Sequence, residues 1–251
     1  MDLDLDGKTA LVTGSSKGLG KIIAQALHKE GCNVVLNGRA TPALERLAAE
    51  IGERAGAIAA DVTDPASCRE LVARAEKRFG KIDILVCNVG SGQSVPPGQE
   101  NPSEWRRMLD LNLMSTTNMV EATTENLART CGAVLCISSI SGIEALGAPV
   151  TYSAAKAALN AYVRGMARPL GQRGIRINAI APGNLFFEGS VWERKLKENA
   201  VAVEDMLQRD VALRRLGRPE EVADFAIFLV SSRSTFATGA VFIVDGGQTR
   251  S

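Results

Sequence analysis

Histidine is nearly absent from this sequence, and its few cysteines show no metal-binding pattern. His28 is the only histidine among 251 residues, and the five cysteines include no CxxC pair. Because a Ser-His-Asp triad and a histidine-rich metal site both need suitably placed histidines, we expect neither, and we expect no metal ion. Several cysteines lie in apolar runs, which predicts buried free thiols at Cys32, Cys68, Cys87, Cys131 and Cys136. Any proton transfer must then use a different side chain.

Long apolar runs and an excess of charge of one sign are absent as well. No run approaches the roughly 20 apolar residues that span a bilayer, and the first residues, MDLDLDGK, are acidic, unlike a signal peptide. The 29 basic and 28 acidic residues leave a net charge of +1, which gives no bulk attraction to nucleic acid. We therefore expect a cytoplasmic protein without nucleic-acid or membrane partners.

Short apolar runs alternate with longer segments of helical period, which is typical of βαβ units. Strands are expected within residues 9–13, 33–37, 57–61, 84–88, 133–138, 175–180 and 240–244. Helices are expected to begin near Gly18, Thr41, Asp64, Ser103, Tyr152 and Pro219. Strands that are apolar on both faces need helices on both sides of the sheet. The predicted fold class is α/β, a doubly wound Rossmann fold with a seven-stranded, mostly parallel sheet.

The chain shows no linker rich in Pro, Gly or Ser, so we expect one domain over residues 1–251. The longest interruption of the alternation is a helical segment of mixed charge at about 184–218. Because ligands of α/β sheets lie beyond the carboxyl ends of the strands, we interpret this segment as a substrate lid. A helical hairpin with structural duties only is the alternative.

The stretch LVTGSSKGLGKIIAQAL, residues 11–27, leads from an apolar strand through a Gly-rich turn into a helix. A triphosphate-binding P-loop is excluded, because Ser15 and Ile22 occupy the places of its first Gly and its Ser or Thr. Gly14, Gly18 and Gly20 suit a dinucleotide-binding turn, where glycines allow a tight turn and close approach of a pyrophosphate. An ordinary strand-to-helix connection is the other interpretation.

Tyr152 and Lys156 are four residues apart on an expected helix, so both project from one face. A nearby ammonium stabilises a phenolate and lowers the pKa of a tyrosine, which is ordinarily about 10. The pair is therefore a candidate acid/base unit in a chain with one histidine. On the residues alone, a solvated helix face is the alternative.

Eight motifs in order resemble those of the short-chain dehydrogenase/reductase family. They are TGSSKGLG, DVTD, CNVG, LDLNLMS, ISSISG, YSAAK, RINAIAPGN and VDGG, and they cover nearly the whole chain. The resemblance implies an oxidoreductase that moves a hydride between a nicotinamide cofactor and a carbonyl or alcohol substrate. It also implies a catalytic set of Asn112, Ser139, Tyr152 and Lys156.

In this family pattern each catalytic residue has its own role. Tyr152 exchanges a proton with the substrate oxygen, and Lys156 lowers the pKa of that tyrosine and binds the cofactor ribose. Ser139 hydrogen-bonds the substrate oxygen, with Ser138 and Ser141 as competing candidates. Asn112 supports a water linked to the lysine. Tyr162 lacks a lysine four residues on and is interpreted as packing.

The end of the second expected strand favours NADP(H) over NAD(H). Gly38 stands where the family's NAD-binding Asp would be, and Arg39 follows it. Lys17, inside the glycine turn, supplies a second positive charge, and the pair suits a 2′-phosphate. The resemblance implies that Tyr152 and Lys156 also contact the cofactor and that Ile180 lies by the nicotinamide. The other cofactor-binding residues that it implies are Gly14, Ser16, Lys17, Gly18, Leu19, Gly20, Arg39, Asp61, Val62, Asn88, Gly90, Pro182 and Gly183. Asp61 could instead cap the helix that follows it.

Two positions depart from the family pattern. Val89 replaces a common Ala, which we expect to change packing only, and Phe187 replaces a common Thr near the nicotinamide. The contacts that the lid makes around Phe187 therefore do not follow from the resemblance.

The pattern is most similar to 3-oxoacyl thioester reductases. The expected substrate is therefore a small carbonyl or alcohol compound, either free or bound to a carrier protein. Arg129 and Arg173 are candidate carrier contacts, with ordinary solvated charge as the alternative. Rival functions are a sugar, polyol or other secondary-alcohol dehydrogenase and a non-catalytic NADP(H)-sensing module. The family resemblance also implies a homotetramer or homodimer.

Overall fold

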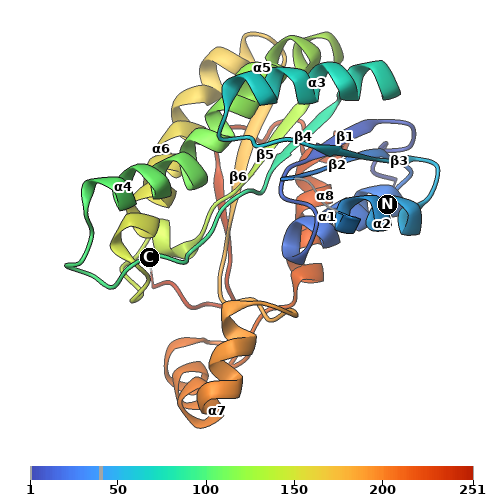
Figure 1. Ribbon diagram of the computed structural model, residues 1–251. Helices are drawn as coiled ribbons and strands as arrows, with labels where there is room; N and C mark the ends of the chain where they lie inside the picture. The colour runs from blue at the N-terminus through green and yellow to red at the C-terminus, as the bar shows by residue number, and fades with distance from the viewer. Residues whose placement is uncertain (1, 40–41, 251) are drawn as a thin grey trace.

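The computed structural model describes residues 2–39 and 42–250, and a seven-stranded sheet forms its centre (Figure 1). All neighbouring strands are parallel, in the order β3-β2-β1-β4-β5-β6-β7. The strands are β1 Thr9–Val12, β2 Asn33–Gly38, β3 Ala55–Ala59, β4 Ile84–Cys87, β5 Ala133–Ile137, β6 Arg176–Pro182 and β7 Val241–Val244. The predicted doubly wound Rossmann fold is confirmed. The third strand begins two residues earlier than the sequence pattern indicated.

Helices cover both faces of the sheet (Figure 1). On one face, α1, α2 and α8 bury Val12, Val34 and Leu36, and on the other, α3, α5 and α6 bury Leu11, Val35 and Leu85. The helices are α1 Gly18–Lys29, α2 Pro42–Ile51, α3 Pro65–Phe79, α4 Pro102–Leu109, α5 Ser115–Thr130, α6 Val150–Gly171, α7 Val191–Asp210 and α8 Pro219–Val230. The helix start expected near Thr41 lies outside the described residues.

Asp64 caps α3, because its carboxylate accepts the backbone N–H of Ser67 at 2.8 Å. The alternative role of Asp61 as the cap of this helix is therefore wrong. Asp61 accepts the N–H and the hydroxyl of Thr63 in the turn before the helix, at 3.0 and 2.7 Å.

The glycine turn joins β1 to α1 through close backbone packing. Gly14 and Gly18 have φ angles of +62° and +59°, which favour glycine. A Cβ on Gly20 would lie 2.4 Å from Nδ2 of Asn88 and 2.6 Å from the Gly14 carbonyl oxygen. Asn88, just after β4, donates that amide to the carbonyls of Thr13 and Gly14, both at 3.1 Å. The turn is thereby fastened to the neighbouring strand.

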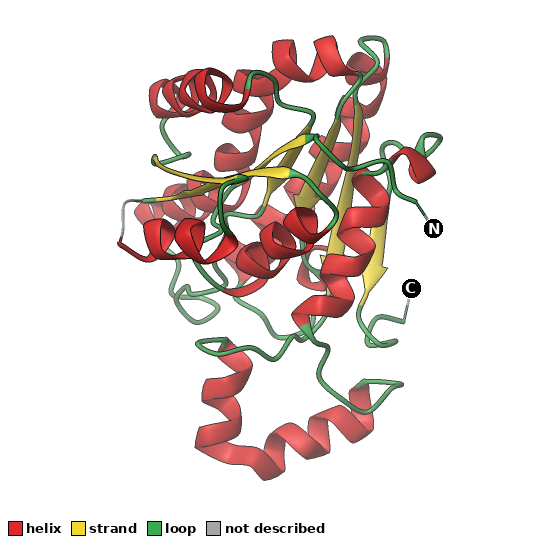
Figure 2. Ribbon diagram, turned by 90° about the vertical axis from the view of Figure 1, so that its right-hand side faces the viewer, coloured by secondary structure: helices red, strands yellow, loops and turns green. Residues whose placement is uncertain are grey.

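The segment 184–218 extends away from the sheet beyond its carboxyl ends (Figure 2). Ser190 caps α7 by accepting the N–H of Glu193 at 3.0 Å. The helix bends at Asn199, whose φ and ψ are −158° and 86° and whose side chain caps the second half through Ala202. A small cluster around Val203, Leu207 and Val211, apart from the two large cores, holds the segment together.

Four of the cysteines are buried as predicted, but Cys131 is exposed. It ends α5 in a left-handed conformation with φ of +49°, which places it at the exposed end of the helix, so the expectation of burial is wrong there. Among the described residues, no helix combines the length and the apolar character that a membrane crossing requires.

We predict that Gly20→Ala lowers the free energy of unfolding by about 1 to 3 kcal/mol, because the added methyl group overpacks the contact with Asn88 and Gly14. Urea unfolding followed by circular dichroism measures the change.

Gly171→Ala is the matched control. Gly171 is the last residue of α6 and has nothing within 4 Å of a Cβ position, so alanine there should leave stability unchanged or raise it by up to about 1 kcal/mol. Equal losses in both variants would contradict the packing role of Gly20.

Candidate active site

One large cavity, of about 1180 Å³, opens beyond the carboxyl ends of β4, β5 and β6 and beneath α7. Parallel strands deliver their following loops to the same edge of the sheet, which is why distant motifs meet there. Of the catalytic candidates, Ser139, Tyr152 and Lys156 line the cavity. Cofactor candidates from three separate segments line it as well, namely Leu19, Asn88, Gly90, Pro182 and Gly183.

Lys156 is a buried cation in the second turn of α6, with only 3% of its surface exposed. Its Nζ donates to the Ile137 carbonyl oxygen at 2.8 Å, and it lies 5.9 Å from the centre of the Tyr152 ring. Burial lowers the pKa of this lysine to about 8. The i,i+4 spacing thus brings both side chains to the face of α6 that borders the cavity.

Burial also raises the pKa of Tyr152 above its ordinary value, and a hydrogen bond from Ser139 opposes the rise. The direction of this shift is opposite to the expected lowering by Lys156. The geometry explains this, because Nζ of Lys156 donates to the Ile137 carbonyl and the phenol is poorly solvated. The phenol is therefore protonated at neutral pH.

The structure separates the three serines after β5. Ser138 donates to the amide oxygen of Asn160 at 2.6 Å, so its hydroxyl serves the packing of α6. Ser139 accepts the N–H of Ser141 at 3.1 Å and lines the cavity, while Ser141 does not. Ser138 also lines the cavity, but its hydroxyl is engaged by Asn160, so the choice of Ser139 as the substrate-binding serine stays a prediction.

Asn112 lies in a π-helical turn, Asp110–Met114, between α4 and α5. Its side-chain amide donates to the carbonyls of Met108 and Ser91, and its oxygen accepts the Ser91 N–H at 3.0 Å. A Cβ on Gly90 would come within 2.8 Å of the Asn112 oxygen and 3.1 Å of Nζ of Lys156. The loop after β4 therefore packs tightly on two catalytic candidates. Sequence pattern gave no sign of the π-helical turn, which often marks functional sites.

The remaining cofactor candidates lie along the edge from the glycine turn to β2 and β3. Lys17 and Arg39 are exposed, and the described residues provide neither with an ion-pair partner. A Cβ on Gly38 would lie 3.7 Å from the Ser16 hydroxyl, so this strand end faces the turn. Val62 is buried in the core below α3, so only its backbone can reach a ligand.

Phe187 packs directly on the glycine turn. A Cβ on Gly18 would lie 2.9 Å from Cε2 of its ring, so only glycine leaves room there. The segment 184–218 therefore contacts the N-terminus of α1 through an aromatic ring, at the position where many relatives have a threonine.

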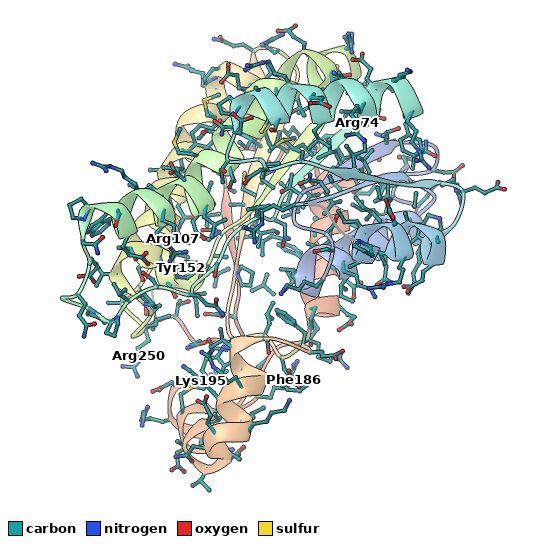
Figure 3. The ribbon with its side chains drawn as sticks, in the orientation of Figure 1. Arg74, Arg107, Tyr152, Phe186, Lys195 and Arg250 are labelled. Atoms are coloured by element: carbon teal, nitrogen blue, oxygen red, sulfur yellow. The ribbon has the colours of Figure 1, made fainter. Side chains whose placement is uncertain are left out.

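A hydrogen-bonded network beside Tyr152 was not predicted. Ser94 donates to Glu104 and shares a hydrogen bond of 2.7 Å with Thr151, which is fully buried and precedes Tyr152. Arg107 binds Glu104 through two nitrogens and holds the pKa of that carboxyl at about 2. Figure 3 labels Arg107 and Tyr152, which come from the neighbouring helices α4 and α6. The network fixes the loop 91–99 against α4 and α6, and no sequence signal marked it because its members are far apart in the chain.

The described residues contain no group of three or more His, Cys, Asp or Glu side chains placed to hold a metal ion.

Comparison with known sequences assigns the chain to a family. Residues 14–249 match the family model described as Enoyl-(Acyl carrier protein) reductase. Glucose 1-dehydrogenase 2 of Bacillus subtilis is 35% identical, over 98% of this chain and 96% of that protein. The 3-oxoacyl-[acyl-carrier-protein] reductase FabG of Salmonella typhimurium is 30% identical, over 98% and 99% of the two chains.

Comparison with solved structures agrees. L-sorbose reductase of Gluconobacter frateurii, in complex with NADPH and L-sorbose, superposes with a TM-score of 0.94 at 29% identity, covering all of both chains. The fold, the full-length matches and the oxidoreductase relatives together show that this chain is an enzyme of the short-chain dehydrogenase/reductase family.

Proposed function

We propose that the protein interconverts a ketone and a secondary alcohol with NADP(H). The observation that carries the proposal is the convergence of Ser139, Tyr152 and Lys156 on one cavity, with Asn112 packed behind them. A binding module would need none of these acid/base groups, so this convergence favours an enzyme over the NADP(H)-sensing alternative.

In the proposed reduction, Ser139 and Tyr152 bind the substrate carbonyl oxygen as hydrogen-bond donors. The bound nicotinamide supplies the hydride. As negative charge develops on the oxygen, Tyr152 transfers its phenolic proton and Ser139 stabilises the charge. Lys156, as a cation, stabilises the phenolate left behind. Its burial next to Tyr152 strengthens that interaction because little water screens it. Oxidation follows the same steps in reverse.

The residues present fit a dinucleotide with a 2′-phosphate. The N–H groups at the start of α1 suit a diphosphate. A side chain in place of Gly90 would crowd the ammonium that is proposed to bind the ribose, because a Cβ there would lie 3.1 Å from Nζ of Lys156. Lys17 and Arg39 are exposed cations near the end of β2, where Gly38 supplies no carboxylate to repel a phosphate. The structural neighbour in complex with NADPH supports this choice.

The substrate class that we propose first is a 3-oxoacyl thioester, supported by the similarity to 3-oxoacyl-[acyl-carrier-protein] reductase. A sugar or polyol is the second candidate, favoured by the polar side chains of Gln93, Ser94, Asn184 and Gln248 in the cavity wall. The relatives include proteins named for both kinds of substrate.

The suggested carrier contacts receive no support. Arg129 is ion-paired with Glu76, and Arg173 binds Glu125 through two bonds of 2.9 Å. Both arginines precede strand starts, at the edge of the sheet opposite the cavity. A carrier protein, if one delivers the substrate, would have to dock elsewhere.

We also propose a homotetramer or homodimer. Phe236 is fully exposed at 105%, and Phe228 and Ile243 lie partly exposed on the neighbouring α8 and β7. Exposed apolar side chains on neighbouring elements suit contact with another copy.

We predict that Tyr152→Phe lowers kcat by about 10²- to 10⁴-fold, because the proton donor is removed, while the Kd for NADPH stays within about twofold. Tyr162→Phe is the control, since Tyr162 packs against the core cluster that contains Leu159 and Val163 and should leave kcat unchanged. NADPH oxidation with a panel of 3-oxoacyl thioesters, diketones and sugars measures both. Turnover by the Tyr152 variant at the wild-type rate would refute the assignment.

We predict that Lys17→Met and Arg39→Met each lower kcat/KM for NADPH by about 10-fold, and lower that for NADH little, because each removes a charge-assisted contact to the 2′-phosphate. Lys21→Met is the control, because this lysine on α1 pairs with Glu50. Equal losses in kcat/KM for NADPH and NADH would show that these cations do not contact the 2′-phosphate.

We predict that Lys156 makes the stability of the cofactor-free protein rise with pH. The pKa of this lysine is about 8 in the folded protein and ordinarily about 10.5, so above pH 8 the unfolded chain binds more protons and stability rises with pH. Relative to Lys156→Met, the wild type should gain about 2 kcal/mol between about pH 7 and 9.5. Urea unfolding at both pH values measures the difference, and a constant difference would show that Lys156 is not desolvated.

A further inference from the structure

The lid carries an excess of positive charge into the cavity. Five charged residues line it, of which Lys156, Arg194, Lys195 and Arg209 are cationic and Asp210 is anionic. Two of these cations are already engaged. Lys156 is bound to the Ile137 carbonyl, and Arg209 binds Asp210 through two bonds of 2.9 and 2.8 Å. The other two cations, Arg194 and Lys195, lie in the first turns of α7, so the excess positive charge is located there.

Lys195 is held at the cavity wall without a carboxylate partner among the described residues. Its Nζ lies 4.4 Å from the centre of the Trp192 ring, and the indole packs against the cluster of Val203, Leu207 and Val211. A cation over an indole keeps its full charge while its position is restricted. Figure 3 shows Lys195 at the end of α7 nearest the rest of the molecule.

Arg194 adds a second charge at the same place. Its only ion pair within the described part of the chain is with Glu198, at 3.7 Å, and both side chains are well exposed. An exposed pair of this kind has little net energy, so the guanidinium can turn to a stronger partner. The ligand that two adjacent cations in a cavity suit best is an anion.

We infer that the substrate of this enzyme carries an anionic group, a carboxylate or a phosphate, separate from the carbon that reacts, and that Lys195 and Arg194 bind it. This inference rests on the proposed function, because it describes the substrate of the same cavity. It excludes neutral sugars as the preferred substrates and admits keto acids and phosphate-bearing thioesters.

The cofactor is the other source of an anion near this site. Its 2′-phosphate is expected at Lys17 and Arg39, and its diphosphate at the start of α1, where Phe187 covers Gly18. Ser190 donates its backbone N–H to the Phe187 carbonyl, and Lys195 lies five residues, about 7 Å, farther along α7. The lid thus contacts the glycine turn through an apolar ring, and its two cations lie farther along α7, where they line the cavity.

The experiment compares matched pairs of ketones that differ only in charge. One set contains methyl ketones with a terminal carboxylate at increasing chain length, each with its methyl ester, and the other pairs dihydroxyacetone phosphate with dihydroxyacetone. We expect wild-type kcat/KM for the best anionic member to exceed that of its neutral partner by about tenfold, with the preference reduced at high salt. Equal values for charged and neutral partners at every chain length would overturn the inference.

The variants are Lys195→Met and Arg194→Met, with Lys197→Met as the control. Lys197 lies on the same helix but pairs with Glu193 at 2.8 Å and does not line the cavity. Each cavity variant should lose roughly fivefold in kcat/KM for the anionic ketone, with unchanged values for the neutral partner and for the Kd of NADPH. If the cavity variants also bind NADPH more weakly, the two cations contact the cofactor and not the substrate. If the Lys197 variant loses as much kcat/KM for the anionic ketone, the effect comes from the overall charge of the helix. Either outcome overturns the inference.

A binding measurement separates failure of this inference from failure of the proposed function. In a Trp105→Phe background, Trp192 is the only tryptophan, and an anion that draws Lys195 away should change its fluorescence. If no ketone is reduced but the carboxylate series still alters this signal in a Lys195-dependent way, the anion site stands and the proposed function fails. If neutral ketones are reduced in a Tyr152-dependent way without any response to the carboxylates, the proposed function stands and the inference fails.

Discussion

The hydrogen bond from Lys156 to the Ile137 carbonyl organises the site. A buried ammonium is costly unless strong acceptors surround it, and this carbonyl at the end of β5 is the one protein acceptor that the described structure provides at a hydrogen-bonding distance. The bond ties α6 to the sheet edge and thereby sets the position of Tyr152. Burial lowers the pKa of Lys156 and raises that of Tyr152, so both shifts favour the neutral form of the group, and for Tyr152 this is the form that can donate a proton.

Most of the fold followed from the sequence because local signals and the global architecture agree. Strands such as β4, Ile84–Cys87, are apolar on both faces, which is typical of central strands in a parallel sheet. The beginning of β3 was missed because Ala55 and Gly56 have weak strand propensity and pair through tertiary context. Asp61 was a plausible cap on residue type alone, yet Asp64 has that role because Pro65 begins the helix.

The candidate site was predictable where chemistry depends on short motifs. The i,i+4 spacing of Tyr152 and Lys156 is visible in the sequence. The difference between Ser138, whose hydroxyl binds Asn160, and Ser139, whose hydroxyl accepts the Ser141 N–H, is visible only in the side-chain contacts. The network of Ser94, Glu104 and Thr151 could not be predicted, because its members meet only after a long loop has folded back on α6.

The two halves of the cavity differ in how they are held. The catalytic half is built on strand ends and α6, where packing against the large cores and short hydrogen bonds leave little freedom. The segment 184–218 is held by a small cluster around Leu207, by a bent helix and by the bridge between Leu185 and Gly217 at its base. A segment with few buried contacts can shift at low cost in free energy. Under the proposed function, the reaction class would depend on the half that is packed on the sheet, and the choice of substrate on the charges that the segment 184–218 brings to the cavity.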